Sequence, residues 1–100
     1  MIDLHLDYLI IVQRILAQCV PGVEVRAFGS RVRQTAKPHS DLDLAIVADK
    51  KLDFKTLADL QEAFQDSDLP IRVDVVDWHG ISKEFKGIIE EKYEVIQQKR

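Results

Sequence analysis

Apolar positions recur along this chain with two spacings, one typical of helices and one typical of strands. In residues 3–20 apolar side chains return every three or four positions, which predicts a helix. Pro21 and Gly22 end that pattern. Residues 23–28 follow as an apolar run with the length of a strand. The chain therefore opens with a helix that leads directly into a strand.

The rest of the chain continues the alternation of helices and strands. The predicted order is helix, strand, short helix, strand, helix, strand, helix, which describes a small α/β domain that spans residues 1–100. Its three main strands pack against the flanking helices. The further strands are predicted over residues 42–48 and 71–77, and the further helices over residues 31–34, 54–65 (with Asp53 as N-cap) and 81–98.

The stretch between the first two predicted strands carries two adjacent carboxylates. Asp41 and Asp43 stand at the start of the second strand. Because side chains two apart in a strand point the same way, both carboxylates share one face. The two negative charges repel each other, and a bound cation would relieve that repulsion. Mg²⁺ takes oxygen ligands of this kind, typically one or two carboxylates together with substrate phosphates.

The other end of the same stretch has the residues to hold a phosphate. Gly29 allows a ligand to approach the backbone closely, and Ser30 is expected to be the N-cap of the short helix that follows. Helix N-termini bind anions, and Arg31 or Arg33 would add charge-assisted contacts. Ser40, just before the carboxylates, either orients Asp41 or is a plain hydroxyl at the strand start, and the sequence leaves both interpretations open.

The third predicted strand carries one more carboxylate, Asp74. A single aspartate inside an apolar strand is costly unless it is paired or bound to metal. By alternation Asp74 shares a face with Arg72 and Val76. Asp77, at the strand end, is expected to cap the next turn, and Trp78 to fill the core.

Together these residues resemble the signature of the DNA polymerase beta-like nucleotidyltransferase superfamily. That signature is a Gly-Ser pair followed by Asp-x-Asp, here Gly29-Ser30 and Asp41-Leu42-Asp43. The fuller run Gly-Ser-Arg-x-Arg, the Ser-Asp-Leu-Asp-Leu and the later Val-Asp-Val-Val-Asp-Trp are similar to the smallest members, the minimal nucleotidyltransferase (MNT) domains. Gln34 departs from the pattern, because many relatives carry glycine there.

The resemblance implies a mixed sheet in which Asp41, Asp43 and Asp74 converge at one edge and act as catalytic and metal-binding residues. Three carboxylates can hold two Mg²⁺ ions, which stabilise the entering and leaving oxygens of an in-line displacement. The substrate is then ATP or another NTP, gripped by Gly29 and Ser30 with Arg31 or Arg33. Asp74 would accept the proton of the attacking hydroxyl, and pyrophosphate would leave.

Composition and charge narrow the class of partner. The chain has 100 residues, 46% hydrophobic and 31% charged, with a net charge of −3. This composition is typical of a globular protein. A net negative charge argues against nucleic acid as the main partner, because nucleic-acid binders usually have a basic surface. The single cysteine, Cys19, fits a reducing compartment, and no apolar run has the length of a membrane span. We therefore expect a cytoplasmic protein, and its self-association is left open.

The residues do not identify the acceptor to which the nucleotide is transferred. Small MNT proteins are commonly paired with a HEPN-domain protein, and in some pairs the HEPN protein is an RNase toxin. The MNT protein then acts as antitoxin by transferring AMP to a tyrosine of the toxin. The resemblance implies that function here. Two alternatives remain: an antitoxin that neutralises its partner by contact alone, and a nucleotidyltransferase for a small molecule such as an antibiotic.

Overall fold

A mixed sheet lies at the centre of the computed structural model, which describes residues 2–100. In chain order the elements are α1 (Leu6–Cys19), β1 (Glu24–Phe28), α2 (Ser30–Arg33), β2 (Leu42–Val47), α3 (Phe54–Gln65), β3 (Val73–Asp77), the 3₁₀ turn η1 (Trp78–Gly80), α4 (Lys83–Glu91) and β4 (Glu94–Gln97). The strand order is β3-β2-β1-β4. β2 runs antiparallel to β1 and parallel to β3, and β4 runs antiparallel to β1.

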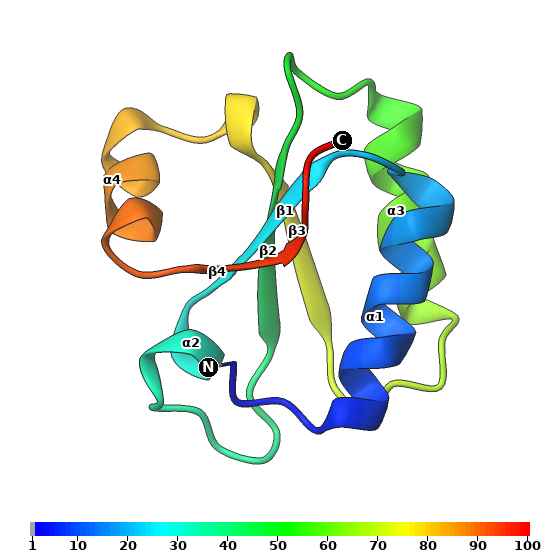
Figure 1. Ribbon diagram of the computed structural model, residues 1–100, viewed down its shortest axis with the longest axis vertical. Helices are drawn as coiled ribbons and strands as arrows, with labels where there is room; N and C mark the ends of the chain where they lie inside the picture. Colours follow the sequence, from blue (N-terminus) through cyan, green and yellow to red (C-terminus); the bar gives the residue numbers. More distant parts are fainter. Residues whose placement is uncertain (1) are drawn as a thin grey trace.

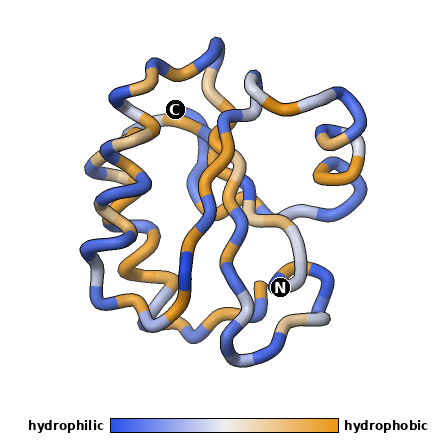
Figure 2. The backbone as a smooth tube through the Cα atoms, turned by 180° about the vertical axis from the view of Figure 1, so that it is seen from behind, coloured by the Kyte–Doolittle hydropathy of each residue, from blue (hydrophilic) through white to orange (hydrophobic). Residues whose placement is uncertain are grey.

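Different helices pack on the two faces of the sheet. Helices α1 and α3 lie together on one face, whereas the shorter α4 lies on the opposite side (Figure 1). The alternation of the strands directs Leu42, Leu44 and Ile46 toward α1 and α3, where all three are fully buried. Seen from behind, hydrophobic and hydrophilic segments alternate along these helices, as expected for elements with one buried side (Figure 2).

The face toward α4 has a smaller apolar cluster. Phe28, Ala45 and Ile89 form its buried centre, and Trp78 and Phe85 pack against it. Phe28 and Phe85 meet edge to face with ring centroids 5.6 Å apart. Trp78 is thus a packing residue, as predicted. The cluster covers only part of this face and leaves the start of β2 and β3 to polar side chains.

The predicted α/β class is confirmed, but the predicted helix over residues 81–98 is wrong in its second half. Ser82 caps α4, its Oγ accepting a hydrogen bond from the Phe85 N–H. The helix ends at Glu91, and β4 adds a fourth strand beside β1. Ile96 is buried in the main core there. Since Ile89 and Ile96 are seven residues apart, a continuous helix was also consistent with the sequence pattern.

Smaller corrections concern where the helices begin. The first helix starts at Leu6 and not at residue 3, with His5 as its N-cap. The short α2 has Gly29 as its N-cap, whereas the sequence predicted Ser30. Two predicted caps are confirmed: the Asp53 carboxylate accepts from the Thr56 N–H, and Asp77 accepts from the N–H of the turn after β3. Each helix in the described range is too short or too polar to cross a membrane.

Candidate active site

The turn from β1 into α2 brings backbone and carboxylate into contact. Gly29 has φ 81° and ψ −155°, a conformation that is almost exclusive to glycine. A Cβ atom added to Gly29 would lie 2.5 Å from Asp43 Oδ2. Glycine is therefore needed for two reasons, the backbone conformation and the space that Asp43 occupies. The Asp43 carboxylate thus lies directly against Gly29, the N-cap of α2.

Asp43 and Asp74 are direct neighbours on adjacent parallel strands. The register pairs Asp43 with Asp74 on one side and with Phe28 of β1 on the other. Burial, followed by the nearby charges of Asp74 and Asp41, raises the pKa of the Asp43 carboxyl to about 6. Asp43 and Asp74 thus lie side by side on the face toward α4, and Asp41 is near enough for its charge to act on Asp43.

Asp74 forms an ion pair with Arg72, a residue that had no role in the site predicted from the sequence. Arg72 Nε lies 2.9 Å from Asp74 Oδ1, and the Arg72 side chain is 73% exposed. Alternation already placed Arg72 on the same face as Asp74, and that spacing of two was the signal in the sequence. An exposed arginine can swing away, so Asp74 remains available to a ligand.

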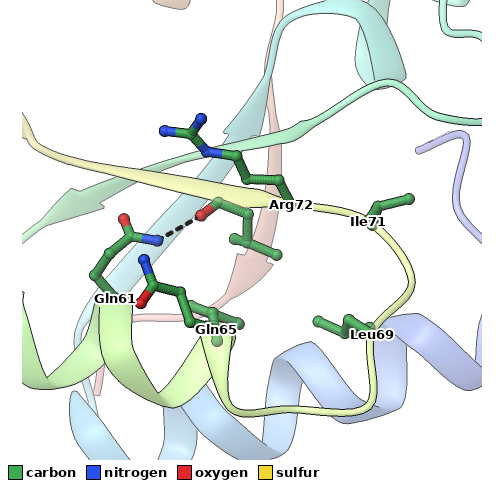
Figure 3. Close-up of a pocket in the computed structure, with 7 residues that line it drawn as sticks. Gln61, Gln65, Leu69, Ile71 and Arg72 are labelled. Carbon is green, nitrogen blue, oxygen red and sulfur yellow. Dashed lines mark hydrogen bonds between the residues drawn. The ribbon is translucent and has the colours of Figure 1, made fainter.

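The outer edge of β3 is held by a side chain of α3. Gln61 Nε2 donates to the Val73 carbonyl, and Gln61 Oε1 accepts from the Val75 N–H. Figure 3 shows this amide against the strand, beside a hollow of about 490 Å³, while Arg72 extends to the other side. Asp74 lies between the two residues that Gln61 binds. The sequence gave no signal for this contact, because it depends on how α3 packs against β3.

Arg31 has a different environment from the one predicted. Its side chain is 7% exposed, and its guanidinium donates to the backbone carbonyls of Ser40, Pro38 and Asp3. These contacts tie the loop of residues 34–41 and the N-terminal segment to α2. They favour a positioning role for Arg31, which holds the residue just before Asp41, over direct contact with a phosphate.

The remaining predicted phosphate ligands lie around the same loop. Ser40 Oγ accepts from the Lys37 N–H, so its hydroxyl helps to close the loop. Arg33 is partly exposed and reaches the Ile88 carbonyl and Glu91 of α4. Gln34 adopts the left-handed conformation, φ 62°, that glycine commonly provides at a helix end.

The carboxylate group has the chemistry of a site for a hard divalent cation. Burial and then the charges of Asp74 and Asp41 raise the pKa of Asp43, and a bound cation would offset that negative charge. Within residues 2–100 no three His, Cys, Asp or Glu side chains are arranged so that they could hold a metal ion by themselves. Mg²⁺ commonly takes only one or two carboxylates and keeps waters and substrate phosphates as its other ligands. The residues therefore fit Mg²⁺ bound together with a nucleotide.

This combination of a glycine turn against paired aspartates defines a nucleotidyltransferase of the polymerase beta type. Residues 13–100 match the family described as polymerase beta nucleotidyltransferase, and the chain belongs to that family. It is similar to a Haemophilus influenzae protein named probable protein adenylyltransferase MntA, with 51% identity over 98 residues, which are 98% of this chain and 86% of that protein. The predicted family membership is confirmed.

Solved structures with this fold include toxin–antitoxin complexes. One, described as a toxin–antitoxin with AMP-PNP, matches with a TM-score of 0.76 and 22% identity over 92% of this chain and 74% of that chain. Another is a tri-AMPylated Shewanella oneidensis HEPN toxin in complex with MNT antitoxin, at TM-score 0.64 and 20% identity over 90% and 72% of the two chains. At these identities the likeness establishes the fold.

Proposed function

We propose that this nucleotidyltransferase transfers AMP from ATP to a tyrosine of a HEPN-domain toxin and thereby acts as its antitoxin. One observation carries the proposal: Gly29 lies directly against Asp43, which in turn pairs with Asp74 across the sheet. This proximity supports a phosphate-binding role for the turn at Gly29 and a metal-binding role for the two carboxylates beside it. The similarity to MntA, named a protein adenylyltransferase, supports AMP and a protein acceptor.

The proposed roles follow from position. The backbone at Gly29 and Ser30 holds the terminal phosphates, because the first N–H groups of a helical turn have no partner inside it. Arg33, which is exposed beside this turn, adds a charge-assisted contact. Arg31 and Ser40 act indirectly, since both hold the loop that leads to Asp41. These contacts orient the triphosphate so that its α-phosphorus faces the carboxylates.

Asp41, Asp43 and Asp74 would hold two Mg²⁺ ions, which neutralise charge on the phosphates during transfer. Asp74, on the edge strand, is the carboxylate that an approaching protein can reach, since β3 is the outermost strand on its side of the sheet. It accepts the proton of the acceptor tyrosine as that oxygen bonds to the α-phosphorus. The bond to the β-phosphate oxygen then breaks, and pyrophosphate leaves.

The acceptor assignment is supported by relatives. The solved complexes of this fold pair MntA with HepT, or an MNT antitoxin with an AMPylated HEPN toxin. A domain of this size offers a shallow site that a separate protein surface would complete. A tyrosine on such a surface supplies the hydroxyl that the reaction needs.

The test is intact-mass analysis of the HEPN-domain protein that co-purifies with the tagged chain from its own host. Wild type is compared with Asp41→Asn, and with Asp59→Asn as a control for loss of a carboxylate on the surface of α3. We expect one or more AMP additions to the partner with wild type and Asp59→Asn, and none with Asp41→Asn. An unmodified partner that binds all three variants equally would instead indicate an antitoxin that acts by contact. Transfer to a small alcohol without any partner would indicate a small-molecule enzyme.

A further inference from the structure

An apolar hollow lies at the outer edge of the sheet, on the strand that carries Asp74. It has a volume of about 490 Å³ and is bounded by the start of α3, the end of β3 and the turn after it. We name it the Phe54 surface and define it by Leu52, Phe54, Leu57, Val76 and Ile81. It lies outside the carboxylate group and is not used in the chemistry above.

Phe54 is the most exposed large apolar side chain of the described residues, with 88% of its surface accessible. It is the first residue of α3, a position that a polar side chain fills equally well. The neighbouring Leu57 and Val76 are only partly buried, so the exposure is shared by a contiguous set of apolar side chains. Contiguous apolar exposure of this kind marks interaction sites.

The Phe54 surface is continuous with the catalytic edge. Val76 follows Asp74 by two residues on β3, so their side chains share a face and their Cα atoms are about 7 Å apart. The other exposed large apolar side chains of the described residues lie elsewhere: Leu6 and Ile10 on α1, Ile88 on α4, and Tyr93 and Val95 at β4. A protein docked on the Phe54 surface is therefore beside the carboxylate that we assign as the proton acceptor.

The charges next to this surface indicate the chemistry of the partner. Lys50 and Lys51 precede it and are exposed, and neither forms an ion pair with another residue in the range 2–100. Lys55 and Lys99, by contrast, are paired with Asp59 and Asp49. Asp53 and Asp77 also line the hollow, but both carboxylates accept backbone N–H groups, and Asp77 is buried. The two unpaired lysines are therefore the charges left to meet a partner, and they are complementary to an apolar side chain flanked by carboxylates.

We propose that the Phe54 surface is the docking site for the acceptor protein, which inserts a large apolar side chain next to acidic residues and so presents its tyrosine to Asp74. The inference rests on the proposed function for the identity of that protein. A hollow of this size anchors one or two side chains, and the rest of the interface extends from it.

Affinity is measured with the co-purified HEPN-domain protein, produced separately, and with this chain as Asp41→Asn, so that no modification alters the partner. We expect Phe54→Ser to weaken binding about 30-fold or more, as for loss of an interface anchor. Leu6→Ser, which removes an apolar side chain of similar exposure from α1, is expected to bind unchanged. Thermal melting of each variant shows that it is folded.

A second pair of variants tests the charges. The double change Lys50→Glu and Lys51→Glu is expected to slow association about 10-fold at low salt and less at high salt. Arg14→Glu, an exposed charge reversal on α1, is its control. Equal binding by Phe54→Ser and Leu6→Ser would overturn the docking site. A dimer of this chain alone that Phe54→Ser dissociates would also overturn it, because a second copy would then occupy the surface.

The two proposals fail separately. If the partner gains AMP but Phe54→Ser binds it normally, only the docking site is refuted. If the partner never gains AMP but Phe54→Ser still loses affinity, the docking site stands and transfer is refuted.

Discussion

Gly29 links the phosphate end of the site to the carboxylate end. Its backbone conformation is one that other residues rarely adopt, and its missing Cβ is the space in which Asp43 lies. A side chain at this position would act on both features at once. The consequences for stability and for transfer should therefore appear together.

We predict that Gly29→Ala abolishes transfer and lowers the free energy of unfolding by about 1–3 kcal/mol. The new methyl group must displace the Asp43 carboxylate, and the backbone must relax from its positive φ. Transfer is measured by intact mass and stability by urea unfolding. Gly87→Ala is the matched control, because a Cβ at that position of α4 meets no atom within 4 Å. It should keep transfer and raise stability by about 0.5–1 kcal/mol. Normal transfer by Gly29→Ala would contradict this account.

Asp43 makes the metal-free protein less stable as pH rises. Its pKa is raised from 3.8 to about 6, first by burial and then by Asp74 and Asp41. Because the folded pKa lies above that of the unfolded chain, the protonated form favours folding. This contribution is fully present below pH 3.8 and is lost as pH rises through about 6. Solvent screening at this partly exposed site limits it to about 1–2 kcal/mol.

We therefore predict that Asp43→Asn stabilises the metal-free protein at pH 7 by about 1–2 kcal/mol while it abolishes transfer. Urea unfolding in the presence of a chelator, from pH 4 to pH 8, is the measurement. The wild type should lose stability relative to Asp43→Asn between about pH 4 and pH 6.5. Asp59→Asn, which removes an exposed carboxylate paired with Lys55, should follow the wild type across this range. Parallel profiles for wild type and Asp43→Asn would show that the pKa of Asp43 is not raised in the folded protein.

At the scale of elements, β4 completes the sheet beside β1. Ile96 is 9% exposed and belongs to the main core with α1 and β1, whereas Val95 is 36% exposed on the opposite side. The Gln13 side chain of α1 also donates to the Ile96 carbonyl. This strand therefore joins the end of the chain to the first helix.

We predict that Ile96→Ser lowers the free energy of unfolding by about 2–4 kcal/mol, because it leaves a cavity in the main core. Val95→Ser, at the neighbouring position, should cost less than about 1 kcal/mol. Chemical denaturation monitored by circular dichroism measures both. Similar losses for the two variants would be expected if this segment were one exposed helix, and would contradict the strand.

At the scale of the whole molecule, the site joins the buried centre of the sheet to a polar surface loop. Leu42, Leu44 and Ile46 of β2 are fully buried between two neighbouring strands. The loop of residues 34–41 is instead held mainly by Arg31 and by the Ser40 hydroxyl. Asp41 lies at the junction of the two. Local opening of the loop therefore costs less than global unfolding.

We predict that the amides of β2 exchange with solvent most slowly and that those of residues 34–41 exchange much faster. Addition of Mg²⁺ with a non-hydrolysable ATP analogue should slow exchange in residues 29–41 of the wild type and leave Asp41→Asn unchanged. Hydrogen exchange followed by mass spectrometry measures this. Protection at the Phe54 surface with no change in residues 29–41 would place the nucleotide elsewhere.

Individual residues show which features of the site could be predicted from the sequence pattern. Asp41, Asp43 and Asp74 were expected to converge at one edge of the sheet, and the register of β2 and β3 pairs two of them, Asp43 and Asp74. Arg31 was grouped with the phosphate ligands because it is adjacent to Ser30. Its burial against three carbonyls is a tertiary feature that local spacing does not encode. The fourth strand, β4, was missed for a similar reason, because residues 94–97 form a strand by pairing with the edge of β1, which is distant in the sequence.

The sequence by itself determined the α/β class, the family and the carboxylates, because each depends on local periods and on motif residues at short spacing. Only the tertiary structure decided the strand order, the conversion of residues 94–97 into a strand, and the position of Arg72 and Gln61 on either side of Asp74. These depend on which edges and faces meet after folding. Hydrogen bonding and burial between distant segments then outweigh the weak preferences of each segment alone.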